Sequence, residues 1–148
     1  LEIGEGAAEL ARFEARWAGD ANVMDKWFLY QIMLAKPDRA ATLTDQLARH
    51  PAFDWKNPNR FRAVIGGLSA NHAGFHHASG AGYRLVADWL LRLDPKNPQT
   101  AARMSTAFET WRRYDAGRQA LVRAELDRMA ASPGLSRDLG EMVGRMLG

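Results

Sequence analysis

Hydrophobic residues recur along this chain at helical spacing, and no segment alternates convincingly between apolar and polar positions. Val, Ile and Thr are sparse whereas Ala, Leu and Arg are abundant, a composition that favours helices. The pattern predicts an all-α protein of about eight helices, at 5–18, 22–35, 39–49, 58–70, 81–93, 98–113, 115–131 and 136–147.

Short breakers separate these helices, and the longest irregular stretch is 71–80. Short connections force neighbouring helices to run antiparallel, so we expect successive helical hairpins. Helix pairs of this length that stack in order form an α-solenoid. No sharp internal repeat appears in the sequence, so the solenoid is inferred from helix and connection lengths alone.

Length and composition indicate one globular domain spanning residues 1–148, with 47% hydrophobic and 25% charged residues. The chain has no Cys, which excludes disulfides and thiolate chemistry and suits a reducing compartment such as the cytoplasm. No apolar run is long enough to span a membrane. Because the chain starts at Leu1 and not Met, we expect a fragment of a longer polypeptide.

The net charge of +3 is spread along the chain, and no run of like charges resembles a nucleic-acid-binding arm. A modest positive excess permits anionic partners without requiring them. One open interpretation is therefore a stand-alone basic α-solenoid that binds protein or nucleic acid.

Two predicted helices begin with the same dipeptide, Asn-Pro, at Asn57-Pro58 and Asn97-Pro98. Asn is a preferred N-cap, and Pro suits the first helical position because its missing N–H costs nothing there. Asp38, Asp115 and Ser136 are predicted to cap three further helices.

An arginine follows each Asn-Pro start, Arg62 in one helix and Arg103 in the other. Arg62 lies about 110° from the centre of its helix's apolar stripe, which is formed by Phe61, Val64, Ile65 and Leu68. The i+4 and i+7 neighbours of both arginines are small residues: Gly66, Ser69, Ala107 and Thr110. Helical geometry alone favours two solvated arginines on an outer face. The alternative is that both face a chamber and bind a carboxylate or carbonyl of a ligand.

His72 and His76 are four residues apart, the spacing that places two zinc ligands on one helix face. Position 73 is Ala where the zinc-protease motif has Glu, and Gly74 argues for a loop instead of a helix. Loop hydrogen bonding is the interpretation we favour, with a small metalloenzyme as a further alternative.

Six aromatic residues at helical spacing are predicted to be core: Trp27, Phe28, Tyr30, Trp89, Phe108 and Trp111.

Five stretches, in order, resemble the C-terminal helical domain of bacterial aminopeptidase N, a zinc aminopeptidase family. They are ANVMDKWF (21–28), NPNRFR (57–62), GFHHASGAGY (74–83), LDPKNPQTAAR (93–103) and RRYDAGRQ (112–119). Each motif is weak by itself, but together they are specific and cover nearly the whole chain.

The resemblance implies an armadillo/HEAT-like superhelix that packs over a catalytic domain, encloses an internal chamber and helps position peptides for removal of N-terminal residues. It implies that zinc lies in the parent enzyme, and that this fragment has no cofactor and no catalytic residue. Family members place arginines matching Arg62 and Arg103 in the chamber wall, which reverses the preference for a solvated outer face. We expect the partners to be the catalytic domain and the peptide, not nucleic acid or membrane. The segment 71–77 looks shorter than in the family, so any substrate contact from the loop 71–80 stays open.

Overall fold

The computed structural model describes residues 6–148, and every regular element in that range is a helix. The chain divides into two compact units, one ending at Gly74 and the other beginning at Phe75, and each is described here by itself. The all-α fold predicted from periodicity is confirmed. No helix among residues 6–148 is both long and apolar enough to cross a bilayer.

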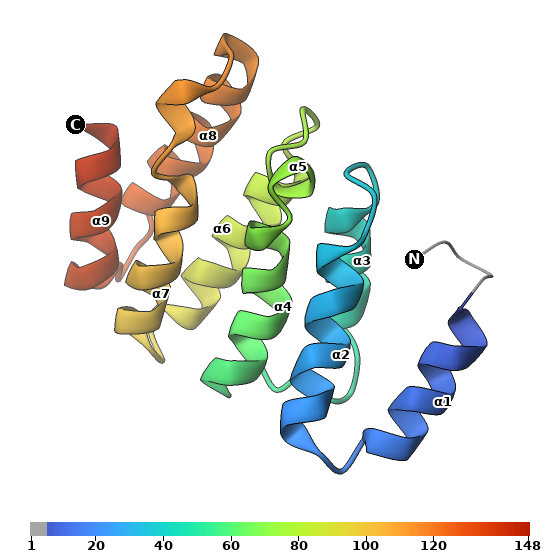
Figure 1. Cartoon of the computed structure of the whole chain (residues 1–148). Coiled ribbons are helices and arrows are strands. Elements are labelled where there is room, and N and C mark those ends of the chain that lie inside the picture. The colour runs from blue at the N-terminus through green and yellow to red at the C-terminus, as the bar shows by residue number, and fades with distance from the viewer. Residues whose placement is uncertain (1–5) are drawn as a thin grey trace. The chain divides into compact units, whose positions relative to one another are not determined.

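The first unit contains four longer helices (Figure 1): α1 (Ala7–Trp17), α2 (Ala21–Met33), α3 (Ala40–Ala48) and α4 (Pro58–Ala70). Helix α2 packs most extensively against α4, and α3 contacts both of them. Helix α1 contacts α2 along a smaller surface. Five fully buried side chains form the centre of this unit: Phe28, Ile32, Phe61, Ile65 and Leu68.

The short helix α5 (His72–Phe75) is a single turn within the stretch predicted as a loop. The turn fits there because Gly74 has no side chain. A Cβ atom on Gly74 would lie 2.4 Å from the Cβ of Ala40 on α3.

The second unit contains α6 (Ala81–Leu93), α7 (Pro98–Met104), α8 (Ala116–Ala130) and α9 (Arg137–Leu147). Helix α9 packs against both α7 and α8, and α6 also contacts both of these helices. Large buried side chains fill the space between them, namely Phe75, Tyr83, Leu90, Phe108, Leu126 and Met129.

The predicted helix 98–113 is wrong in its second half. Helix α7 ends at Met104, and the chain continues as two 3-10 helices, η1 (Ser105–Phe108) and η2 (Trp111–Arg113). The hydroxyls of Ser105 and Thr106 donate to backbone carbonyls three residues earlier, at 2.6 and 2.8 Å. Hydroxyl side chains that bond to nearby carbonyls compete with the α-helical pattern, which accounts for the tighter turn.

Candidate functional site

The two Asn-Pro helix starts form as predicted. The Oδ1 atom of Asn57 accepts from the backbone N–H groups of Asn59 and Arg60 at 3.0 and 3.3 Å, and Pro58 is the first residue of α4. The Oδ1 atom of Asn97 accepts from the N–H of Thr100 at 3.1 Å, with Pro98 opening α7. These caps fix where α4 and α7 begin. They therefore fix the positions of the side chains in the first turns of both helices.

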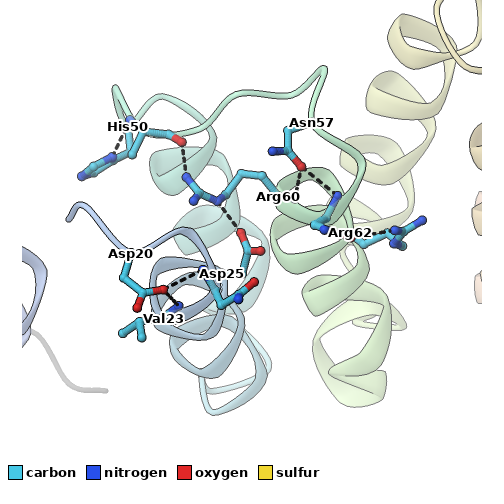
Figure 2. Close-up of polar contacts among 10 residues, drawn as sticks. Asp20, Val23, Asp25, His50, Asn57, Arg60 and Arg62 are labelled. Atoms are coloured by element: carbon cyan, nitrogen blue, oxygen red, sulfur yellow. Dashed lines mark hydrogen bonds and ion pairs between the residues drawn. The ribbon is translucent and has the colours of Figure 1, made fainter. Parts of the chain in front are cut away.

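The two arginines of NPNRFR have opposite environments (Figure 2). Arg60 is buried, and its Nε donates to Asp25 Oδ1 at 2.5 Å while its Nη1 donates to the carbonyl of Ala52. Its guanidinium also lies 5.2 Å from the ring centre of Phe28. Arg62 is exposed and donates from Nη2 to Asn59 Oδ1 at 2.9 Å. Arg60 therefore joins the loop before α4 to α2, whereas Arg62 contacts only its own helix through Asn59 in the hydrogen bonds of the described residues.

Arg62 lines a shallow hollow of about 430 Å³ between α2 and α4, with Asn22, Asp25, Lys26, Leu29, Asn59 and Ala63. The carboxylate of Asp25 is already paired with Arg60. Among the lining residues that the structure describes, the side chains of Arg62 and Lys26 thus leave a net positive charge in this hollow, which suits a carboxylate or carbonyl oxygen.

Arg103 lines a separate hollow of about 440 Å³ between α7 and α9, with Gln99, Ala102, Asp138, Glu141, Met142 and Arg145. Its side chain is exposed. Asp138 and Glu141 offset the charges of Arg103 and Arg145, although Glu141 also pairs with Arg137 at 2.9 Å. This hollow is therefore less favourable to an anion than the hollow around Arg62.

The rows of small neighbours expected beside the two arginines do not line either hollow. Neither Gly66 nor Ser69 belongs to the lining around Arg62, which is built by α2 and the start of α4. Ala107 and Thr110 lie beyond the end of α7, where the α-helical i+4 and i+7 rows no longer continue. The row beside Arg62 forms on α4 as helical spacing predicts, whereas the row beside Arg103 is interrupted at the end of α7. Packing against α2 and α9 decides which residues line each hollow.

His72 and His76 do not share a face. His72 is exposed, whereas His76 is buried, stacks on Tyr114 with ring centres 4.0 Å apart, and hydrogen-bonds the Tyr83 hydroxyl through Nδ1 at 2.8 Å. Burial raises the pKa of Tyr83 to about 12. Within residues 6–148 no three His, Cys, Asp or Glu side chains converge as a metal site would require.

An apolar hollow of about 520 Å³ lies between α1 and α2, and sequence reasoning missed it. We call it the α1/α2 groove; its lining is Gly6, Glu9, Leu10, Phe13, Val23, Lys26, Trp27, Tyr30, Gln31 and Leu34. Tyr30 was expected in the core, but it is 55% exposed at this groove. Apolar residues surround Tyr30 along the sequence of α2, so periodicity could not separate its buried face from its exposed one.

The residues resemble known proteins over almost the whole chain. A family model described as "Domain of unknown function (DUF3458_C) ARM repeats" matches residues 2–148. An aminopeptidase N of Haemophilus influenzae is 42% identical over 93% of the chain, and one of Caulobacter vibrioides is 41% identical over 94%. The chain spans only 16% of the length of each of these relatives.

A solved structure of Legionella pneumophila aminopeptidase A in complex with aspartic acid matches 97% of the chain, with a TM-score of 0.90 and 34% sequence identity. The chain covers 17% of that protein. The ARM-repeat description agrees with the solenoid of helical hairpins that helix and connection lengths predicted. The chain therefore belongs to the DUF3458_C family of ARM repeats, and it corresponds to a small part of much longer aminopeptidases.

Proposed function

We propose that residues 1–148 form a non-catalytic, C-terminal helical domain of a cytoplasmic, zinc-dependent aminopeptidase. In this proposal the domain closes the active-site chamber of the same polypeptide and helps to position peptides for removal of their N-terminal residues. The observation that carries the proposal is the 41–42% identity to aminopeptidases N over more than nine-tenths of the chain.

Zinc has no donor set among residues 6–148, so under this proposal the metal is held elsewhere in the polypeptide. The contribution of this chain is then substrate placement. A peptide bound for N-terminal cleavage presents its remaining carbonyls and its C-terminal carboxylate beyond the cleaved bond. Exposed guanidinium groups can bind such oxygens with charge-assisted hydrogen bonds and so orient the peptide.

Arg62 and Arg103 are the residues that we assign to this role. Arg62 is the better candidate, because Lys26 reinforces its positive charge while Asp25 is engaged by Arg60. Arg103 has acidic side chains in its hollow, so its effect on peptide binding should be smaller.

The test uses the intact enzyme with Arg62→Ala, Arg103→Ala, and Arg49→Ala as a matched exposed control. For short peptides Arg62→Ala should raise KM about tenfold with little change in kcat, since one charge-assisted hydrogen bond contributes about 1.5 kcal/mol. An amino-acid amide lacks oxygens beyond the cleaved bond, so its KM should stay unchanged. Equal peptide kinetics in all three variants and the unmodified enzyme would discard the assignment.

A stand-alone basic solenoid that binds nucleic acid is the competing interpretation. The two hollows do not favour it, because the hollow around Arg103 contains Asp138 and Glu141. Such a protein would bind DNA or RNA more weakly as salt rises. Titration of the purified chain with labelled oligonucleotides at two salt concentrations separates the two interpretations.

A further inference from the structure

The hollow around Arg62 has one acidic side chain in the lining that the structure describes, Asp25. If this carboxylate had no partner of its own, it would offset the charge of Arg62 and Lys26, which line the same hollow. A peptide carboxylate would then compete with Asp25 for these two cations. The partner of Asp25 therefore decides how strongly the hollow attracts an anion.

Arg60 is that partner, although it does not belong to the lining of the hollow. Its Nε donates to Asp25 Oδ1 at 2.5 Å. The side chains of Arg60 and Asp25 are only 11% and 20% exposed, so water and salt screen the pair weakly. Figure 2 shows the guanidinium of Arg60 turned toward Asp25 and that of Arg62 turned away from it. The acidic member of the lining is thus occupied from outside the hollow.

The guanidinium of Arg60 is held by more than the carboxylate of Asp25. Its Nη1 donates to the carbonyl of Ala52, and its centre lies 5.2 Å from the ring centre of Phe28. Asn57 also accepts from the backbone N–H of Arg60 at 3.3 Å, which fixes where its side chain begins. A planar guanidinium can make such contacts together because its N–H groups point in fixed directions. These contacts orient Arg60 toward Asp25 without any ligand.

We propose that Arg60 is a positioning residue that keeps Asp25 from pairing with Arg62 and Lys26, and so makes the hollow selective for a peptide carboxylate. The inference rests on the proposed function and adds the class of peptide that the hollow favours. These peptides end in a free carboxylate or carry an acidic side chain beyond the cleaved bond. Arg60 itself touches no peptide; without it, Asp25 turns to the cations of the hollow and weakens their attraction for the substrate.

The test is a double-mutant cycle in the intact enzyme. Arg60→Gln removes the positive charge but keeps a side-chain donor. For tetra-alanine with a free carboxylate it should raise KM about fivefold with little change in kcat, because a carboxylate released into a wet hollow has a modest Coulomb effect. Asp25→Asn should reverse this rise in the Arg60→Gln enzyme, and should change KM by less than about twofold while Arg60 is present. Arg49→Ala, an exposed arginine outside the lining, is the control.

Two further substrates identify the source of the carboxylate. The rise in KM should be absent for tetra-alanine amide, which has no carboxylate. It should return for the amide with glutamate in place of the third alanine if an acidic side chain is bound, whereas a rise confined to the free acid assigns the C-terminal carboxylate. A rise of equal size for the amide and the free acid would overturn the proposal. A rise that Asp25→Asn does not reverse would overturn it too, since the loss would then be structural.

Asn59→Asp provides a second test that leaves the buried pair intact, should Arg60→Gln fail to fold. It places a carboxylate in the same hollow, beside Arg62, to which Asn59 bonds at 2.9 Å, and in the first turn of α4, where acidic residues are favourable. It should also raise KM for the free acid about fivefold, and an unchanged KM would overturn the inference.

Arg62→Ala distinguishes the failure of this inference from the failure of the proposed function. If Arg62→Ala raises KM for the free acid but neither Arg60→Gln nor Asn59→Asp does so, only the role of Arg60 is wrong. If Arg62→Ala also leaves KM unchanged, the role proposed for Arg62 is wrong, and the inference about Arg60 falls with it.

Discussion

Arg60 and Arg62 are two residues apart on α4, yet the structure gives them different tasks. The sequence marks both as cations after a helix start, and only tertiary contacts distinguish them. Arg60 finds its carboxylate partner on Asp25, which is 35 positions away in the sequence. No local pattern indicates such a pairing, so the sequence alone could not assign Arg60 to the interior.

Arg60→Ala should destabilise the chain by about 3 kcal/mol, because it leaves the Asp25 carboxylate and the Ala52 carbonyl without their partner. Arg62→Ala should change the free energy of unfolding by no more than about 0.5 kcal/mol, as exposed substitutions usually do. Urea denaturation followed by circular dichroism measures both values. Similar losses in the two variants would show that the buried pair is not important for stability.

Tyr83 should make stability decline at alkaline pH. Burial raises its pKa from 10.0 to about 12, so the folded chain disfavours the ionised tyrosine. The contribution of Tyr83 to the free energy of unfolding is complete below pH 10. It decreases between pH 10 and about 12, where Tyr83 ionises readily only in the unfolded chain. Unfolding midpoints measured across this range should fall less steeply for Tyr83→Phe. An identical slope in both proteins would rule out Tyr83 as the cause.

At the scale of elements, periodicity and capping residues predicted most helices well. The observed bounds of α4 and α6 match the predicted bounds at both ends. Asp115 and Ser136 cap α8 and α9 as expected. The exception among the caps is Asp38: the N-cap of α3 is Arg39, and no side chain caps this helix. The end of α7 was also missed, because helix-forming residues continue past the point where Ser105 and Thr106 bond to the backbone.

Two glycines should respond in opposite directions to replacement by alanine. Gly74→Ala should destabilise the chain by about 2 kcal/mol, because its Cβ would collide with Ala40 and force α5 away from α3. Gly144 lies inside α9 with nothing within 4 Å of an added Cβ, so Gly144→Ala should stabilise by about 0.5 to 1 kcal/mol. Thermal unfolding of both variants tests the pair. Two shifts of the same sign would contradict the packing described around Gly74.

At the scale of the whole molecule, the all-α class and the family could be predicted from the sequence. The surroundings of the candidate residues could not be, because they depend on which helices meet. Arg62 faces α2 and Arg103 faces α9, and both neighbours are distant in sequence. The exposure of Tyr30 was missed for a related reason. Most residues of α2 are apolar, so the spacing of its apolar residues does not distinguish the buried face of the helix from the exposed one.

The isolated 148-residue chain should cleave no alanine amide, with or without added zinc, since we place the catalytic groups elsewhere in the polypeptide. The full-length enzyme assayed alongside is the positive control. The proposal that the catalytic groups lie outside this chain would be refuted by one result. The purified chain would have to hydrolyse the amide through successive purification steps and lose that activity when a chelator is added.

Trp27 gives this protein an intrinsic optical probe. The residue is only 8% exposed and its indole N–H donates to the carbonyl of Leu10 on α1, so its emission should shift to longer wavelength when α1 separates from α2 and water reaches the ring. Replacing the other tryptophans with phenylalanine would isolate that signal, and the separation of α1 could then be timed by stopped-flow fluorescence without any attached dye.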